Sequence, residues 1–70
     1  MLGAVLREAR KQAGMTQEAL AGKARMDRAY ISEIERGKAS PSVDRLFQIC
    51  KALGVRASTI LARVERRAVR

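Results

Sequence analysis

The sequence predicts an all-α fold of five short helices, and three observations lead to that prediction. Apolar residues recur at spacings of three and four along most of the chain, as on one side of a helix. Capping residues and glycines divide this pattern into five segments. One Phe, one Tyr and no Trp are present, so aliphatic side chains must fill the core, which is typical of helices packed on helices. No strand pattern, repeat or low-complexity linker interrupts the chain.

The first two helices are expected over residues 2–13 and about 17–23. Gly14 ends the first helix, Thr16 is a suitable N-cap for the second, and Glu18 suits the positive first turn of that helix. The apolar sides are expected to contain Leu2, Val5, Leu6, Ala9 and Ala13 in the first helix and Ala19, Leu20 and Ala24 in the second.

The third helix is short, over about residues 27–36, and the fourth follows after one loop. Asp27 is a suitable N-cap for the third helix and Gly37 a suitable end. The Ser-Pro-Ser segment at 40–42 precedes the fourth helix, which ends at Gly54. The expected core positions are Tyr30, Ile31 and Ile34 in the third helix and Val43, Leu46, Phe47, Ile49, Cys50 and Leu53 in the fourth.

A fifth helix begins near Ala57, and we expect residues 1–70 to form one domain. One sector of this helix is apolar and the remainder is basic. The apolar positions are Ala57, Ile60, Leu61, Val64 and Ala68, and the basic positions are Arg63, Arg66, Arg67 and Arg70. We describe residues 62–70 as a basic C-terminal extension, whose arginines either hold flanking phosphates or repel one another in a disordered tail.

The charge of the chain favours a polyanionic partner. Fifteen Lys and Arg against 7 Asp and Glu give a net charge of +8. A basic composition also suits a membrane-surface peptide or a ribosomal protein. However, no apolar run approaches the roughly 20 residues that span a bilayer, and the N-terminus lacks the pattern of a signal peptide. We therefore expect a cytoplasmic protein without a membrane partner.

The chain lacks the residue types that most catalytic and metal sites need. Cys50 is the single cysteine and there is no histidine, which excludes an internal disulfide and a cysteine-ligated metal site. Paired carboxylates in an apolar setting and a Gly-rich phosphate loop are also missing. We expect Cys50 to be a buried thiol, and we expect no enzyme activity, cofactor, metal or small-molecule ligand.

Residues 16–36 combine two short amphipathic helices with a very short break, the pattern of a helix-turn-helix DNA-binding motif. At about 100° per residue, the second helix turns its polar and small side chains away from its apolar ones. Arg28 suits guanine O6 and N7, Ala29 a thymine methyl group, Ser32 a base or phosphate, and Glu33 cytosine N4. The alternative is an ordinary solvated helix surface on which Glu33 pairs with Arg36.

Four segments, TQEALAGKA, YISEIERG, PSVDRL and KALGV, resemble sequence elements of one family of small bacterial and phage repressors. This family includes Cro and the xenobiotic-response-element regulators, and the resemblance extends to controller proteins of restriction-modification systems. The likeness runs from about Leu2 to about Leu61. It implies a compact lambda-repressor-like DNA-binding domain and a regulator of transcription.

The resemblance also implies roles for individual residues. Gln17 matches the family glutamine that contacts a DNA phosphate and braces the recognition helix. Arg10 and Glu35 match positions that form a structural ion pair. The other positions at which the family contacts the DNA backbone correspond to Thr16, Arg25, Arg36, Lys38 and Ser40. Capping and solvation are the alternative explanations for these residues.

Two residues depart from the family pattern. Arg25 stands in the turn where Gly is usual, and Arg56 stands where Ser usually caps the fifth helix. Arg25 must either adopt a left-handed conformation, at a cost of about 1 to 2 kcal/mol, or the turn must differ locally.

A single recognition helix contacts few base pairs, so related proteins dimerise and bind half-sites roughly 34 Å apart. We expect Val55, Ile60 and Val64 to form the dimerisation surface and assign Leu61 to the core. The resulting hypothesis is a homodimeric repressor that binds a palindromic operator in double-stranded DNA, with a contact to RNA polymerase left open. The alternatives are a protein-interaction module, such as an antitoxin or phage accessory factor, and a nonspecific basic nucleic-acid binder.

Overall fold

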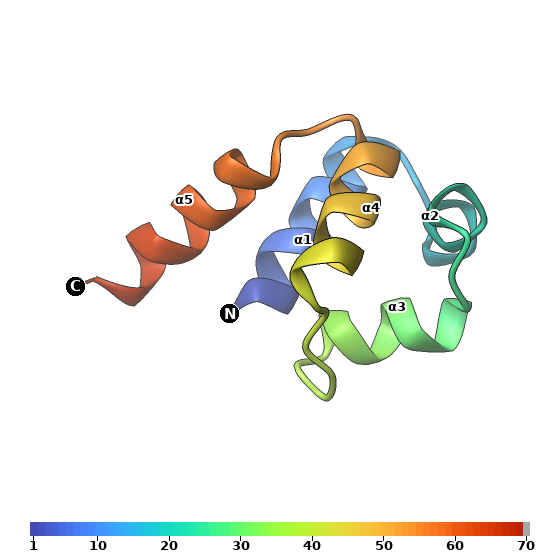
Figure 1. Cartoon of the computed structure of the whole chain (residues 1–70), viewed down its shortest axis with the longest axis horizontal. Coiled ribbons are helices and arrows are strands. Elements are labelled where there is room, and N and C mark those ends of the chain that lie inside the picture. The colour runs from blue at the N-terminus through green and yellow to red at the C-terminus, as the bar shows by residue number, and fades with distance from the viewer. Residues whose placement is uncertain (70) are drawn as a thin grey trace.

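The computed structural model describes residues 1–69, which form five α-helices joined by short turns and loops (Figure 1). They are α1 (Leu2–Gln12), α2 (Gln17–Ala24), α3 (Arg28–Glu35), α4 (Val43–Leu53) and α5 (Ala57–Ala68). No strand occurs among these residues, so the all-α prediction is confirmed. None of the described helices is long and apolar enough to cross a membrane.

The helices enclose one aliphatic core. α2 packs on α3 and α4, α3 packs on α1, and α5 packs on α1 and α4 (Figure 1). Every helix contributes to the large side chains that are almost fully buried, namely Val5, Leu6, Leu20, Ile31, Ile49, Cys50 and Ile60. Removing these side chains from water is the main stabilising contribution to the fold.

Where the sequence marks a helix end with a capping residue or a glycine, the structure follows that signal except at Asp27. The Thr16 hydroxyl accepts a hydrogen bond from the Ala19 amide at 3.0 Å, and the Ser42 hydroxyl accepts one from the Arg45 amide at 3.2 Å. Asp27 occupies the N-cap position of α3, but its side chain makes no capping hydrogen bond, which corrects the role predicted for it. The glycines that follow α1, α3 and α4 all have positive φ, as a helix-ending residue needs.

Several apolar residues that were predicted to face the core are exposed. On α4, Val43 and Phe47 are 66% and 55% exposed, whereas Leu46 and Ile49 are buried. The core-facing side of a helix is an arc roughly 100° wide. Here the helices that pack on α4 cover the arc containing Leu46 and Ile49 and leave the neighbouring positions open. The other predicted core positions found at the surface are Ala13, Ala19, Leu61 and Ala68.

The segment predicted to be a C-terminal extension is part of α5 as far as Ala68 and lies against α1. Arg67 donates from one guanidinium nitrogen to both carboxylate oxygens of Glu8, at 2.5 and 2.7 Å, and this contact lowers the pKa of Glu8. Arg63 donates to Gln12 at 3.4 Å. Through Ala68 the segment is therefore neither a free tail nor a separate arm, because polar contacts with α1 hold it. Arg70 lies outside the described residues.

Candidate nucleic-acid interface

The turn between α2 and α3 sets the geometry of the motif. Arg25 has φ 59° and ψ 48°, so it adopts the left-handed conformation, which was one of the two possibilities expected for this turn. The Met26 amide donates to the Ala21 carbonyl at 2.9 Å and closes the turn. For a residue with a Cβ atom, this conformation raises the free energy of the folded state by about 1 to 2 kcal/mol. Packing of the buried sides of α2 and α3 holds the turn in place despite that cost.

α3 presents the predicted base-contacting residues on its accessible side. We call Arg28, Ala29, Ser32 and Glu33 the recognition face. Three of these residues are exposed and Ser32 is half-buried. The opposite side of α3 is anchored in the core by Ile31 and Ile34, each 2% exposed. The two ion pairs among the described residues lie elsewhere in the fold, so the alternative pairing of Glu33 with Arg36 is not formed.

Tyr30, expected in the core, is only partly buried, at the edge of α3. The guanidinium carbon of Arg45 lies 5.1 Å from the centre of the Tyr30 ring, in the geometry of a cation–π contact. This contact links α3 to the first turn of α4 and helps to fix the orientation of the recognition face.

A buried ion pair lies behind the recognition face. The Nε atom of Arg10 lies 2.7 Å from Oε2 of Glu35, and Nη2 lies 3.0 Å from Oε1. The two side chains are 9% and 3% exposed. Arg10 also donates through Nη1 to the carbonyl of Met15 at 2.8 Å. The resemblance implied this pair, and in the structure it ties α1 and the loop after it to the end of α3.

Gln17 connects this ion pair to the recognition face. Its Nε2 donates to Glu35 at 3.1 Å, and its Oε1 accepts from Nη1 of Arg28 at 3.0 Å. The nitrogen and the oxygen of the Gln17 amide group thus each have a partner, and the two hydrogen bonds together fix the orientation of the group. The chain of contacts from Arg10 through Glu35 and Gln17 reaches the exposed guanidinium of Arg28.

The network also sets the charge of Glu35. Burial by itself raises the pKa of this carboxyl group, but hydrogen bonds from Arg10 and Gln17 and the nearby Arg10 and Arg7 charges lower it, and the net shift is downward. The same contact with Glu35 raises the pKa of Arg10. Both groups are therefore charged at neutral pH and stabilise each other in the folded state.

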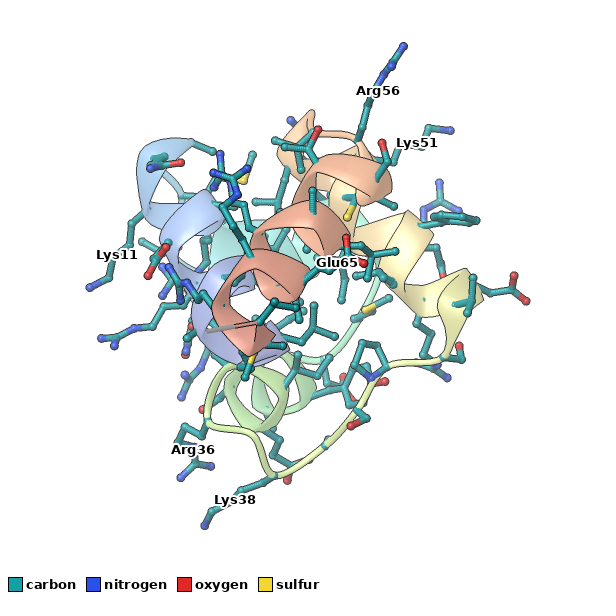
Figure 2. All side chains as sticks on the ribbon, turned by 90° about the vertical axis from the view of Figure 1, so that its left-hand side faces the viewer. Lys11, Arg36, Lys38, Lys51, Arg56 and Glu65 are labelled. Atoms are coloured by element: carbon teal, nitrogen blue, oxygen red, sulfur yellow. The ribbon has the colours of Figure 1, made fainter. Side chains whose placement is uncertain are left out.

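The residues predicted to contact the DNA backbone do not all lie together. Arg36 and Lys38 point away from the body of the protein at one end of the molecule, whereas Lys51 and Arg56 point away at the opposite end (Figure 2). Ser40 is exposed in the loop between α3 and α4. Thr16 and Gln17 line a cleft of about 410 Å³ together with Arg28.

Arg25 is separated from that group. It lines a different cleft, of about 410 Å³, between the end of α2 and α4, together with Lys23, Gln48 and Lys51. Gln17 and Ser32 do not line this cleft. Lys23 and Lys51 contribute positive charge to the cleft. Both stand in the last turns of their helices, where the helix dipole favours cations, so their positions have a structural explanation.

One basic residue near the recognition face was missed. Arg7 is exposed on α1 and lines a cleft of about 280 Å³ with Gln17, Ser32, Glu35 and Arg36. The spacing between Arg7 and Arg10 in the sequence could have identified it. Arg7 precedes Arg10 by three residues, so the two share one side of α1, and Arg10 was already expected to face α3.

Comparison with known proteins agrees with this geometry. Residues 6–60 match the family model described as helix-turn-helix. The chain belongs to the helix-turn-helix family. It is 43% identical over 61 residues to the transcriptional regulator ClgR of Mycobacterium tuberculosis, which covers 87% of this chain and 54% of ClgR. It thus spans about half the length of that relative.

Shorter helix-turn-helix proteins match over more of their length. The control protein C.BamHI of Bacillus amyloliquefaciens is 40% identical over 62 residues, covering 87% of this chain and 76% of the relative. Among solved structures, the restriction-modification controller protein C.Esp1396I, crystallised as a tetramer with its natural 35-base-pair operator, aligns with a TM-score of 0.87. That alignment has 33% identity and covers 99% of this chain and 91% of the controller protein.

The helix-turn-helix domain exposes a different set of apolar residues from the set predicted for dimerisation. Val55 and Val64 are partly buried against the core, but Ile60 is 0% exposed, so its assignment to a surface was wrong. Leu61, assigned to the core, is 48% exposed. Neighbouring positions of a helix differ by about 100°, so the rotation of α5 about its axis decides which of the two residues faces inward. Phe47 was missed because its helix was expected to bury it.

Proposed function

We propose that this protein is a sequence-specific, double-stranded-DNA-binding regulator of transcription, and that it acts as a dimeric repressor at a palindromic operator. The observation that carries the proposal is the exposed recognition face on α3, with Arg28 held by Gln17 and a buried ion pair behind it. Side chains fixed before binding lose less conformational entropy on contact with a base. C.Esp1396I, which aligns over almost the whole chain, binds its operator as a tetramer.

α3 would enter the major groove with the recognition face toward the bases. Arg28 would donate to guanine O6 and N7, Ala29 would contact a thymine methyl group, and Glu33 would accept from cytosine N4. Ser32 would contact a base or a phosphate. The proposed backbone contacts, which fix register without reading sequence, are Thr16, Gln17, Arg36, Lys38 and Ser40, with Arg25 a more distant candidate.

A second copy of the chain would bind through α4 and α5, which pack on each other. Val43 and Phe47 on α4 and Leu61 on α5 are large apolar side chains left in contact with water. Val55 and Val64, which are partly buried, would extend that surface. We propose that the dimer covers these side chains, since a domain this small leaves apolar surface that it cannot bury alone.

We further propose that the five helices are one DNA-binding domain, which works in the cytoplasm and performs no catalytic step. Its experiment is selection of bound sequences from a random duplex pool at physiological salt, with Arg28→Ala and Lys51→Ala run beside the native protein. Lys51 is a suitable control because it points away from the end that carries Arg36 and Lys38 (Figure 2). An inverted repeat should be enriched, and Arg28→Ala should lose preference at one base pair in each half-site, at about 1 to 3 kcal/mol.

The two alternatives predict other outcomes. A nonspecific basic binder would retain duplexes without enriching a sequence, and Arg28→Ala and Lys51→Ala would weaken it alike. A protein-interaction module would show little preference among duplexes and would bind a protein partner tightly. Either result would contradict the proposal that residues of α3 contact the bases.

A further inference from the structure

We propose that Arg7 is a DNA-contact residue of α1, and that it forms with Arg36 a clamp for one phosphate group beside the recognition face. This inference rests on the proposed function and adds a third helix to the interface. The cleft between the two arginines has a volume of about 280 Å³ and is lined by residues of α1, α2 and α3 and by the residue that ends α3.

Arg7 lies beside α3 because of its position on α1. A Cβ atom on Gly3 would lie 2.1 Å from the carbonyl oxygen of Ile34, so α1 and the end of α3 approach as closely as a glycine allows. Arg7 follows Gly3 by one helical turn and Arg10 follows Arg7 by three residues, so all three share one side of the helix. Arg10 reaches Glu35 on α3. Arg7 is held between these two contacts and next to the same helix.

Charge in the cleft favours an anion. Glu35 is the one acidic residue in its lining, and both of its oxygens are already engaged by Arg10 and Gln17. Its negative charge is thus matched by the buried Arg10. Arg7 and Arg36 remain exposed, and no ion pair to either is found among the described residues.

The remaining polar lining suits a phosphate. Ser32 is half-buried in the cleft and its hydroxyl can donate to a phosphate oxygen. Two guanidinium groups and a hydroxyl are donors of the type that protein–DNA interfaces direct to phosphates. The cleft lies at the end of α3 that leads to Lys38, and Figure 2 shows Arg36 and Lys38 together at that end. A duplex with α3 in its major groove would pass its backbone along this edge.

A simpler explanation is that Arg7 only offsets the negative charge of Glu35 and of the C-terminal end of α3. The two explanations differ in their dependence on salt. Releasing one phosphate contact reduces the slope of log K against log salt concentration by about 0.9, whereas a purely intramolecular charge leaves the number of phosphate contacts unchanged.

The experiment measures the affinity of the native protein, Arg7→Gln and Lys51→Gln for the selected operator and for an unrelated duplex, at salt concentrations from about 50 to about 300 mM. Lys51→Gln removes the same charge at the opposite end of the molecule (Figure 2). Arg7→Gln should weaken both duplexes by a similar factor and reduce the slope by up to about 0.9 for each bound subunit, since Arg36 still contacts the phosphate. Lys51→Gln should leave the slope within error of the native value.

Two further variants keep the test decisive. Arg7→Lys retains the charge and should restore most of the slope, which a change caused only by altered folding would not do. Arg36→Gln should resemble Arg7→Gln because both would contact one phosphate. Equal slopes for Arg7→Gln and Lys51→Gln would overturn the clamp while leaving the proposed function intact, and a loss confined to the operator would instead make Arg7 a base contact. Failure of the native protein to prefer any duplex would refute the proposed function itself.

Discussion

Gln17 accepts a hydrogen bond from Arg28 at 3.0 Å, so the first residue of α2 holds the one cation of the recognition face. The same amide group donates to Glu35, whose carboxylate is fixed by Arg10. The orientation of the Arg28 side chain is therefore set by contacts that begin at the buried ion pair of Arg10 and Glu35.

We predict that Gln17 and Arg28 act together on DNA. Gln17→Ala removes both the proposed phosphate contact and the acceptor that holds Arg28, so part of the effect of Arg28→Ala is already lost in that variant. In a double-mutant cycle on the selected operator, the two changes should be non-additive by about 0.5 to 3 kcal/mol. Lys38→Ala combined with Arg28→Ala is the control and should be additive, because Lys38 lies beyond the end of α3 opposite Arg28. Additive energies for Gln17 and Arg28 would show that the hydrogen bond has no role in binding.

The Arg10–Glu35 pair should make a large contribution to the stability of the fold. Arg10→Met leaves the Glu35 carboxylate buried without its partner and should lower the free energy of unfolding by about 3 to 5 kcal/mol near neutral pH. The double variant Arg10→Met with Glu35→Leu should recover most of that loss because neither charge remains. Urea denaturation followed by circular dichroism measures both. A double variant no more stable than Arg10→Met would contradict this account.

The same pair predicts a pH dependence. The folded-state pKa of Glu35 lies below its ordinary value of 4.5, so the unfolded chain takes up the proton first as pH falls. The stability from this group is complete above the ordinary pKa and is lost as pH decreases through the lower, folded-state pKa. Denaturation at several acidic pH values should show the native protein losing stability relative to Arg10→Met. A constant difference would mean that Arg10 does not lower the pKa of Glu35 in the folded state.

Two glycine substitutions should change stability in opposite directions. A Cβ atom on Gly3 would meet backbone oxygens of Ile34 and Glu35 at 2.1 and 2.8 Å, so α1 must move away from α3. Gly3→Ala should cost about 1 to 3 kcal/mol. Gly22 lies within α2 with no heavy atom within 4 Å of such a Cβ, so Gly22→Ala should stabilise by up to about 1 kcal/mol. Thermal melting of both variants distinguishes close packing from helix propensity.

The turn before α3 stores strain that a single substitution can release. Arg25→Gly removes the Cβ atom from the left-handed position and should raise the free energy of unfolding by up to about 1 kcal/mol. Arg25→Ala keeps the Cβ atom and should give no such increase. Equal stabilities for the glycine and alanine variants would show that the turn relaxes without cost.

Local features of the fold were predictable because their causes lie within a few residues. Thr16 and Ser42 cap their helices with their own hydroxyls, and the glycine after α4 ends that helix in a left-handed conformation. The recognition face followed from helical spacing, since α3 turns its apolar residues inward and leaves the others accessible. Asp27 shows the limit of such reasoning, because a suitable residue type at the N-cap does not ensure a capping bond.

Errors arose where burial depended on how one helix is rotated against another. Ile60 and Leu61 are neighbours of similar size, and the sequence pattern does not say which one faces the core. Phe47 belongs to the same apolar pattern as Leu46 but lies outside the part of α4 that its neighbours cover. The arginines of α5 were indistinguishable from a tail until Arg67 was found against Glu8, 59 positions away.

The sequence by itself determined five helices, their ends, the helix-turn-helix segment and the residues of the recognition face, because periodicity, caps and glycines act over one or two turns. Only the tertiary structure decided that Gln17 joins Arg28 to the ion pair, that Arg7 lies in a cleft with Arg36, and that Phe47 and Leu61 remain exposed. Those relationships depend on the rotation and approach of whole helices, which are set by simultaneous packing of side chains distant in the chain.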